Sequence, residues 1–279
     1  MAFVPLHGRR PPRHTRGDSE LRRSRRPTMP IATPTLDWDW ATRSGGNLTA
    51  AERRALTVGL VRVVPALVPQ RVRQALGRRG AGRLDLNEAR VPDTALARAA
   101  EIEAREHLSD SLLEHSFRTY FFARALAELD GVEYDDEIAY VASLLHDLKL
   151  EKPTPGRCFA VASGESAHGF AVRHGAPADR AEAIGAAIAA HLNPNAAENL
   201  GDAGGFVSAG ASVDVIGRRL ADLAPDWVDE LLARHPRHDF KRQLIARFTA
   251  EAAAVPDGRI HWLNGTGFLQ LIKLAPFAE

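Results

Sequence analysis

DEIAYVASLLHDLKL, residues 136–150, is the stretch that decides the fold. Its apolar residues recur at the spacing of one face of an α-helix: Ile138, Val141, Leu144, Leu145 and Leu148. Acidic residues at its start favour a helix N-terminus, and Pro153 and Pro155 end the segment. His146 and Asp147 therefore lie at the end of a buried helix. A buried carboxylate needs a partner, and a divalent metal ion is one such partner.

A second His-Asp pair, His238-Asp239, lies in the stretch ARHPRHDFKR at residues 233–242. That stretch is polar, contains a proline and has no apolar face. We interpret this stretch as surface. Of the two His-Asp pairs, we therefore assign only His146-Asp147 to a metal site.

Four further candidates lie on other expected apolar helices. His115 belongs to a helix at 108–131, His168 to one at 163–175 and His191 to one at 178–192. Asp214 lies in a run that follows a Gly-rich loop at 201–205, and we expect its small neighbours Gly210 and Gly217 to leave space beside the carboxylate. The order H…HD…H…H…D has gaps of 31, 21, 23 and 23 residues, each long enough for one helix and a turn. A helical bundle can direct all six groups into one cavity.

The composition is that of an ordinary globular protein, with 45% hydrophobic and 25% charged residues. The charge is uneven, because residues 1–35 carry a net +6 and the rest a net −5. We predict that residues 1–35 are a disordered Arg/Pro-rich extension and that residues 36–279 form a single helical domain. The acidic body argues against a nucleic-acid partner.

Cys158 is the only cysteine, which excludes an internal disulfide and fits a reducing compartment. No signal-peptide pattern is evident, and the most apolar early stretch, residues 56–68, contains Arg62 and Pro65 and is too short to cross a bilayer. We therefore expect a cytoplasmic protein without a membrane partner. No strand-like alternation appears, so the expected fold class is all-α.

The H…HD…D pattern of His115, His146-Asp147 and Asp214 resembles the HD-domain superfamily of metal-dependent phosphohydrolases. This motif resemblance covers residues 110–220. Five stretches are similar to the cyanamide-hydratase-like branch, for which the resemblance extends from Trp38 to the C-terminus: HSFRTYFFA at 115–123, YVASLLHDL at 140–148, AIAAHLNP at 187–194, GASVDVIG at 210–217 and the terminal PFAE. It implies an all-α bundle with a metal site between the helices.

The resemblance implies four primary metal ligands, namely His115, His146, Asp147 and Asp214. His191 matches a histidine that lines the pocket, and we leave open whether it is a ligand or a catalytic acid/base. Asp147 is also expected to take a proton from the attacking water.

Three residues remain ambiguous. His168 departs from the hydratase-like branch and is a candidate ligand for a second ion. Lys149 is atypical after the His-Asp pair and is expected to add positive charge to the pocket. Arg118, three residues after His115, either clamps an anionic substrate or forms a structural ion pair.

The function expected from these residues is hydrolysis or hydration of a small molecule, a phosphate ester or a nitrile such as cyanamide, by water activated at a divalent ion. The ion is Zn, Mn, Ni or Fe, with one ion expected and a second left open. The competing hypotheses are a di-iron oxygenase of HD type and a sensor or binding module without turnover. The partner is a small-molecule substrate, and a homo-oligomer is left open.

Overall fold

The computed structural model describes residues 35–58, 60, 72 and 80–279. The predicted extension at 1–35 lies almost entirely outside the described residues, as does most of the apolar stretch at 56–68. The domain boundaries stay predictions.

Helices account for the regular structure, which confirms the all-α fold class. Among the described residues only isolated β-bridges occur, such as that between Asn47 and Gly258. The helical elements in chain order are α1 Trp38–Ser44, a segment at 50–58, α3 Ala95–His107, α4 Asp110–Asp130, α5 Asp136–Leu145, α6 Phe159–Arg173, α7 Ala178–Ala190, η1 Ala196–Glu198, α8 Ala203–Ile216, η2 Leu220–Asp222, α9 Pro225–Arg234, α10 Phe240–Ala254, α11 Arg259–Gly265 and α12 Phe268–Lys273.

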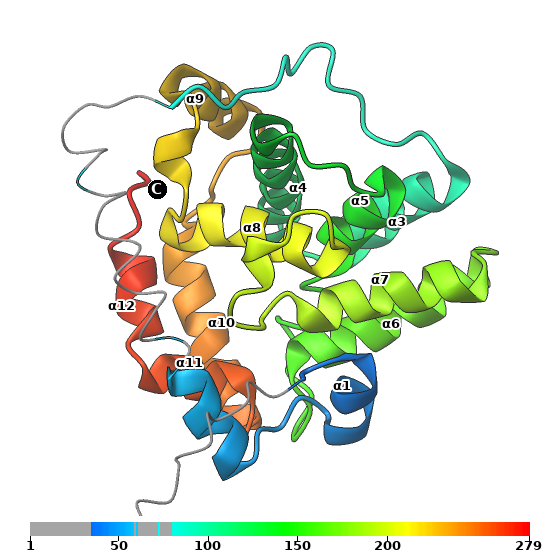
Figure 1. The fold of residues 1–279 in the computed structure, drawn as a ribbon, viewed down its shortest axis with the longest axis vertical. Helices are drawn as coiled ribbons and strands as arrows, with labels where there is room; N and C mark the ends of the chain where they lie inside the picture. The colour runs from blue at the N-terminus through cyan, green and yellow to red at the C-terminus, as the bar shows by residue number, and fades with distance from the viewer. Residues whose placement is uncertain (1–34, 59, 61–71, 73–79) are drawn as a thin grey trace, which may run out of the picture. The chain divides into compact units, whose positions relative to one another are not determined.

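Helix α5 comes from the stretch at 136–150, and it packs against α3, α4, α7 and α8. The Asp135 side chain caps its first turn by accepting a hydrogen bond from the amide of Ile138. The helix ends at Leu145, so His146 and Asp147 lie in the turn that follows it. Figure 1 shows α4, α5 and α8 close together, and α6 and α7 side by side.

Helix α8 packs closely on α4 because Gly210 has no side chain. A Cβ atom at Gly210 would lie 1.9 Å from the carbonyl oxygen of Thr119 on α4. We expected Gly210 to leave space beside Asp214, whereas its role is to let the two helices approach. This approach brings Asp214 of α8 next to His115 of α4.

Two helices begin earlier than predicted. The loop expected at 201–205 is shorter, because Asp202 caps α8 through the amide of Gly205 and the helix begins at Ala203. Helix α6 begins at Phe159 rather than at residue 163.

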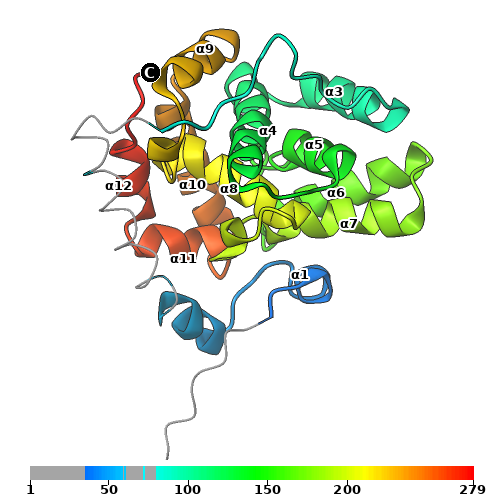
Figure 2. The same ribbon diagram turned by 45° about the horizontal axis from the view of Figure 1, so that its top comes forward.

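Helices α10, α11 and α12 are in contact with one another, and Figure 2 shows them on the side opposite α3 and α5. They contribute Leu244, Phe248, Leu263 and Phe268 to the pocket described below. No helix among the described residues is long and apolar enough to span a bilayer.

Candidate metal centre

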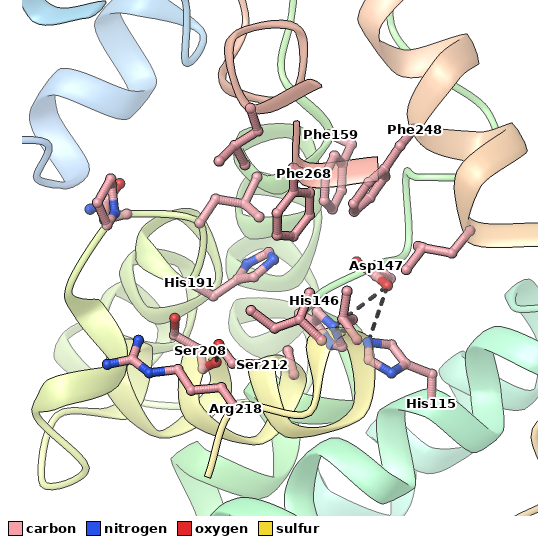
Figure 3. A pocket seen from close by; sticks show the side chains of 18 of the residues that line it. His115, His146, Asp147, Phe159, His191, Ser208, Ser212, Arg218, Phe248 and Phe268 are labelled. Carbon is pink, nitrogen blue, oxygen red and sulfur yellow. Dashed lines mark hydrogen bonds and ion pairs between the residues drawn. The ribbon is translucent and has the colours of Figure 1, made fainter. Parts of the chain in front are cut away.

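His115, His146 and Asp147 lie together in the interior, each with one ligand atom within 4.8 Å of the others. Nε2 of His115 is 3.3 Å from Nε2 of His146. The Asp147 Oδ2 atom lies 3.8 Å from the first nitrogen and 3.5 Å from the second, as the dashed lines in Figure 3 indicate. The three side chains come from α4 and from the turn after α5.

Hydrogen bonds elsewhere on the two rings decide which nitrogens are free. Nδ1 of His146 lies 2.8 Å from the carbonyl oxygen of Ser143, which can only accept, so Nδ1 carries the proton. Nδ1 of His115 lies 2.7 Å from Oδ2 of Asp214 and donates to that carboxylate. In the neutral rings both Nε2 atoms are therefore acceptors, and they face each other.

The result is a buried group of three acceptors, two imidazole nitrogens and one carboxylate oxygen. Such atoms repel one another at these separations unless a cation lies between them. Donor atoms bound at about 2.0–2.2 Å in a tetrahedral arrangement are roughly 3.3 Å apart, which is close to the observed spacing. The donor set and its geometry fit a divalent metal ion.

Burial lowers the pKa of His115, although Asp214 opposes this effect. The lower pKa favours the neutral imidazole that a metal ion needs as a ligand.

Asp214 does not join this group, although it is fully buried beside it. Its two oxygens accept hydrogen bonds from Nε and Nη2 of Arg118, at 2.9 and 2.8 Å, and Oδ1 also accepts from Arg237. Burial opposes ionisation of Asp214, but the charges of Arg118 and Arg237 outweigh it and hold the pKa of the carboxyl well below its usual range. Asp214 is thus a permanent carboxylate that orients His115 from the side away from His146.

Arg118 makes its hydrogen bonds inside the protein, to Asp214 and to the carbonyl oxygens of His235 and Pro236. Of the two readings of this residue, the geometry favours the structural ion pair. Arg237 is also buried, above the rings of Phe240 and Phe277, and its Nε bonds to Glu279. The stretch 233–242 is therefore only partly surface, although His238 and Asp239 are exposed as expected.

His191 follows α7 and approaches the group from the other side. Its ring centroid lies 5.1 Å from that of His146, with the two rings nearly perpendicular. Nδ1 donates to the carbonyl oxygen of Ile188 at 2.6 Å, which leaves Nε2 as an acceptor. Burial, together with a smaller effect of His146, lowers the pKa of His191 well below its usual value. His191 is thus a neutral imidazole beside the three-residue group.

The structure does not bring His168 or Lys149 to this group. The half-buried His168 has its ring 6.3 Å from that of Trp38. Lys149 is half-buried, and its backbone amide donates to Ser163 Oγ. Neither residue is among those that line the pocket.

The pocket has a cavity volume of about 140 Å³ and contains His115, His146, Asp147 and His191 in its wall. The rest of the lining is mostly apolar, with Phe159, Phe248 and Phe268 from three helices. Ser208, Ser212, Asn193, Asn195 and Arg218 supply the remaining polar atoms. Arg218 was not among the predicted site residues. It directly follows the GASVDVIG stretch at 210–217, but it stands next to Arg219, and no spacing rule separates the two arginines.

Comparison with known protein families agrees with the geometry. The sequence model of the HD domain matches residues 112–224, and so the chain contains an HD domain over those residues. This region carries His115, His146, Asp147, His191 and Asp214. No curated protein matches the chain.

Proposed function

We propose that the HD domain of this chain is the catalytic domain of a metal-dependent hydrolase that acts on a small organic molecule. The observation that carries the proposal is the convergence of three buried acceptor atoms, from His115, His146 and Asp147, at metal-ligand spacing. These three residues would hold one divalent ion, Zn, Mn, Ni or Fe.

A bound divalent ion supplies a Lewis acid that lowers the pKa of its water and polarises the substrate. Three protein ligands beside a pocket resemble catalytic sites, which keep a position open, rather than structural zinc sites with four protein ligands. Asp214 keeps Nδ1 of His115 protonated and so directs the lone pair of Nε2 toward His146. The carboxylate–imidazole pair thereby fixes both the tautomer and the ring orientation.

His191 is the residue best placed to move a proton. Since Nδ1 is committed to Ile188, proton transfer must use Nε2, which begins as an acceptor. Nε2 can take a proton from the attacking water and return it to the leaving oxygen of an ester or to the nitrogen of a nitrile. His191 thus takes the role of base that the sequence analysis expected of Asp147, and it then acts as the acid.

The pocket supports a small substrate. Its volume of about 140 Å³ resembles that of a cavity that accepts a single aromatic ring, and much of its wall is aromatic. The two candidate classes are a phosphate ester, which is consistent with the HD domain, and a nitrile such as cyanamide, which rests on the resemblance to the hydratase-like branch.

A di-iron oxygenase is less well supported. A second ion needs further ligands, and His168, whose ring centroid lies 6.3 Å from that of Trp38, is not part of the three-residue group. A sensor without turnover has no observation in its favour, because the three-residue group and His191 all border the pocket.

The test is to purify the protein without chelators, measure its metals and assay it with cyanamide and with 4-nitrophenyl phosphate. We expect turnover of one of these that is lost with a chelator and restored by a divalent ion. Two tightly bound iron ions with oxygen consumption would instead support the oxygenase. A chain that binds no metal and turns over neither compound would contradict the proposal.

A further inference from the structure

Arg218 lines the same pocket as the proposed metal ligands but lies at its other end. It follows Gly217, whose left-handed backbone conformation (φ 72°) ends α8. In Figure 3, Arg218 lies on the side of Ser208 and Ser212, whereas Asp147 and His115 lie on the opposite side, with His191 between. The pocket therefore has a reactive end and a cationic end.

The guanidinium of Arg218 has no close anionic partner among the described residues. The one carboxylate within 4 Å there is that of Glu198, whose Oε1 lies 3.8 Å from Nη2, beyond hydrogen-bonding distance, and whose side chain is 60% exposed. The Arg218 side chain itself is only 20% exposed. By contrast, the buried Arg118 and Arg259 have hydrogen-bond acceptors at 2.6–3.1 Å.

A guanidinium that is mostly removed from water needs an anion to replace its hydration. Burial already lowers the pKa of Arg218, an effect that nearby Glu198 opposes without cancelling it. A planar carboxylate or a phosphate can accept two parallel hydrogen bonds from such a group. The cationic end of the pocket is thus suited to an anionic group of a bound molecule.

Much of the remaining pocket wall is apolar. Phe159, Phe248 and Phe268 form its aromatic part, and Leu244 and Leu263 extend it. A space of about 140 Å³ suits a small apolar body.

We propose that this pocket selects small organic anions: the anionic group binds Arg218, the apolar body lies against the phenylalanines, and the reacting group reaches His115, His146 and Asp147. This inference rests on the proposed function and adds the substrate class to it, which favours an anionic substrate over a neutral nitrile such as cyanamide. Arg218 is then a specificity-determining residue, separate from the residues that hold the ion.

The experiment compares benzoate with benzamide, which have nearly the same shape and differ in charge, by calorimetric titration of the metal-loaded protein. Wild-type protein is expected to bind benzoate at least about tenfold more tightly than benzamide, as charge-assisted hydrogen bonds do. Arg218→Met should remove this preference, and Arg218→Lys should retain part of it. Arg242→Met removes a charge at an exposed position and should leave the preference unchanged.

A titration of His146→Ala locates the benzoate carboxylate. If the carboxylate binds Arg218, the preference for benzoate survives loss of the ion. A preference that survives in Arg218→Met but disappears in His146→Ala would place the carboxylate on the ion and overturn the inference. Failure of wild-type protein to prefer benzoate over benzamide would also overturn the inference about Arg218. The proposed function is tested separately: it fails if the protein neither binds metal nor hydrolyses any substrate. Melting temperatures of all variants show whether each is folded.

Discussion

Nδ1 of His115 lies 2.7 Å from Oδ2 of Asp214, and this contact leaves Nε2 of the same ring free to face His146. The carboxylate comes from α8 and the imidazole from α4, two helices that approach closely at Gly210. Two buried arginines keep the carboxylate ionised. The account therefore assigns Asp214 an orienting role and reserves direct metal binding for His115, His146 and Asp147.

The first prediction concerns this orienting role. Asp214→Asn should weaken Co²⁺ binding by about 10- to 100-fold, as loss of an outer partner of a ligand does. It should also lower the free energy of unfolding by about 3–5 kcal/mol, because Arg118 and Arg237 lose a buried counter-charge. Co²⁺ titration and urea denaturation measure the two effects. A folded variant with no detectable metal would instead make Asp214 a direct ligand.

His191 should be required for the reaction and not for the metal. His191→Asn is expected to lower kcat by about 10²–10⁴, the usual contribution of a positioned acid/base, with unchanged metal content. Steady-state kinetics and elemental analysis of the same preparation check this. Loss of the ion together with the activity would identify His191 as a ligand.

His168 should be dispensable for the ion, since its ring lies near that of Trp38 rather than in the three-residue group. His168→Ala is expected to retain full metal content and to lose less than about tenfold in activity. If the wild-type protein holds two ions and this variant holds one, the second-ion hypothesis is correct.

Glu251 should make stability depend on pH. Burial raises its pKa to about 7, although the Phe159 amide and Arg259 oppose this. The folded state then holds a proton that the unfolded state releases near pH 4.5, so stability falls as pH rises from about 4.5 to about 7 and levels off above. With each pKa unit worth about 1.4 kcal/mol, ionisation costs the folded state on the order of 3 kcal/mol.

The matched variant is Glu251→Gln, whose amide oxygen can still accept the hydrogen bond from Phe159. We expect it to be more stable than wild type at pH 8, with a smaller difference at pH 5. Urea denaturation at the two pH values measures this. Equal differences at both values would show that Glu251 keeps an ordinary pKa.

Local signals explain how much of the fold could be predicted. Helix α4 lies close to the predicted range of 108–131. It ends as predicted because Gly131 adopts the left-handed conformation (φ 66°) that commonly ends a helix. The start of α6 was missed because Cys158 provides no side-chain cap. The first amide, of Phe159, is instead satisfied by Glu251 of α10 at 2.7 Å, a tertiary contact that no local pattern reveals.

For the candidate site, too, local patterns could predict which residues are buried but not which tertiary contacts they make. His146 and Asp147 follow a periodic apolar helix, and His115 lies on another, so their burial could be expected. The pairing of Asp214 with Arg237 could not, because Arg237 lies in a polar stretch and becomes buried through Phe277 at the C-terminal end.

The central claim is that His115, His146 and Asp147 hold one divalent ion, and metal content per chain tests it most directly. The proteins compared are wild type, Asp147→Ala and a control that carries both His238→Asn and Asp239→Asn. Asn is chosen for the control because it tolerates the positive φ angles of 51° and 58° at these exposed positions. After purification without chelators, we predict one ion per chain in wild type and control and almost none in Asp147→Ala. Unchanged metal in Asp147→Ala, or loss of metal in the control, would contradict the account.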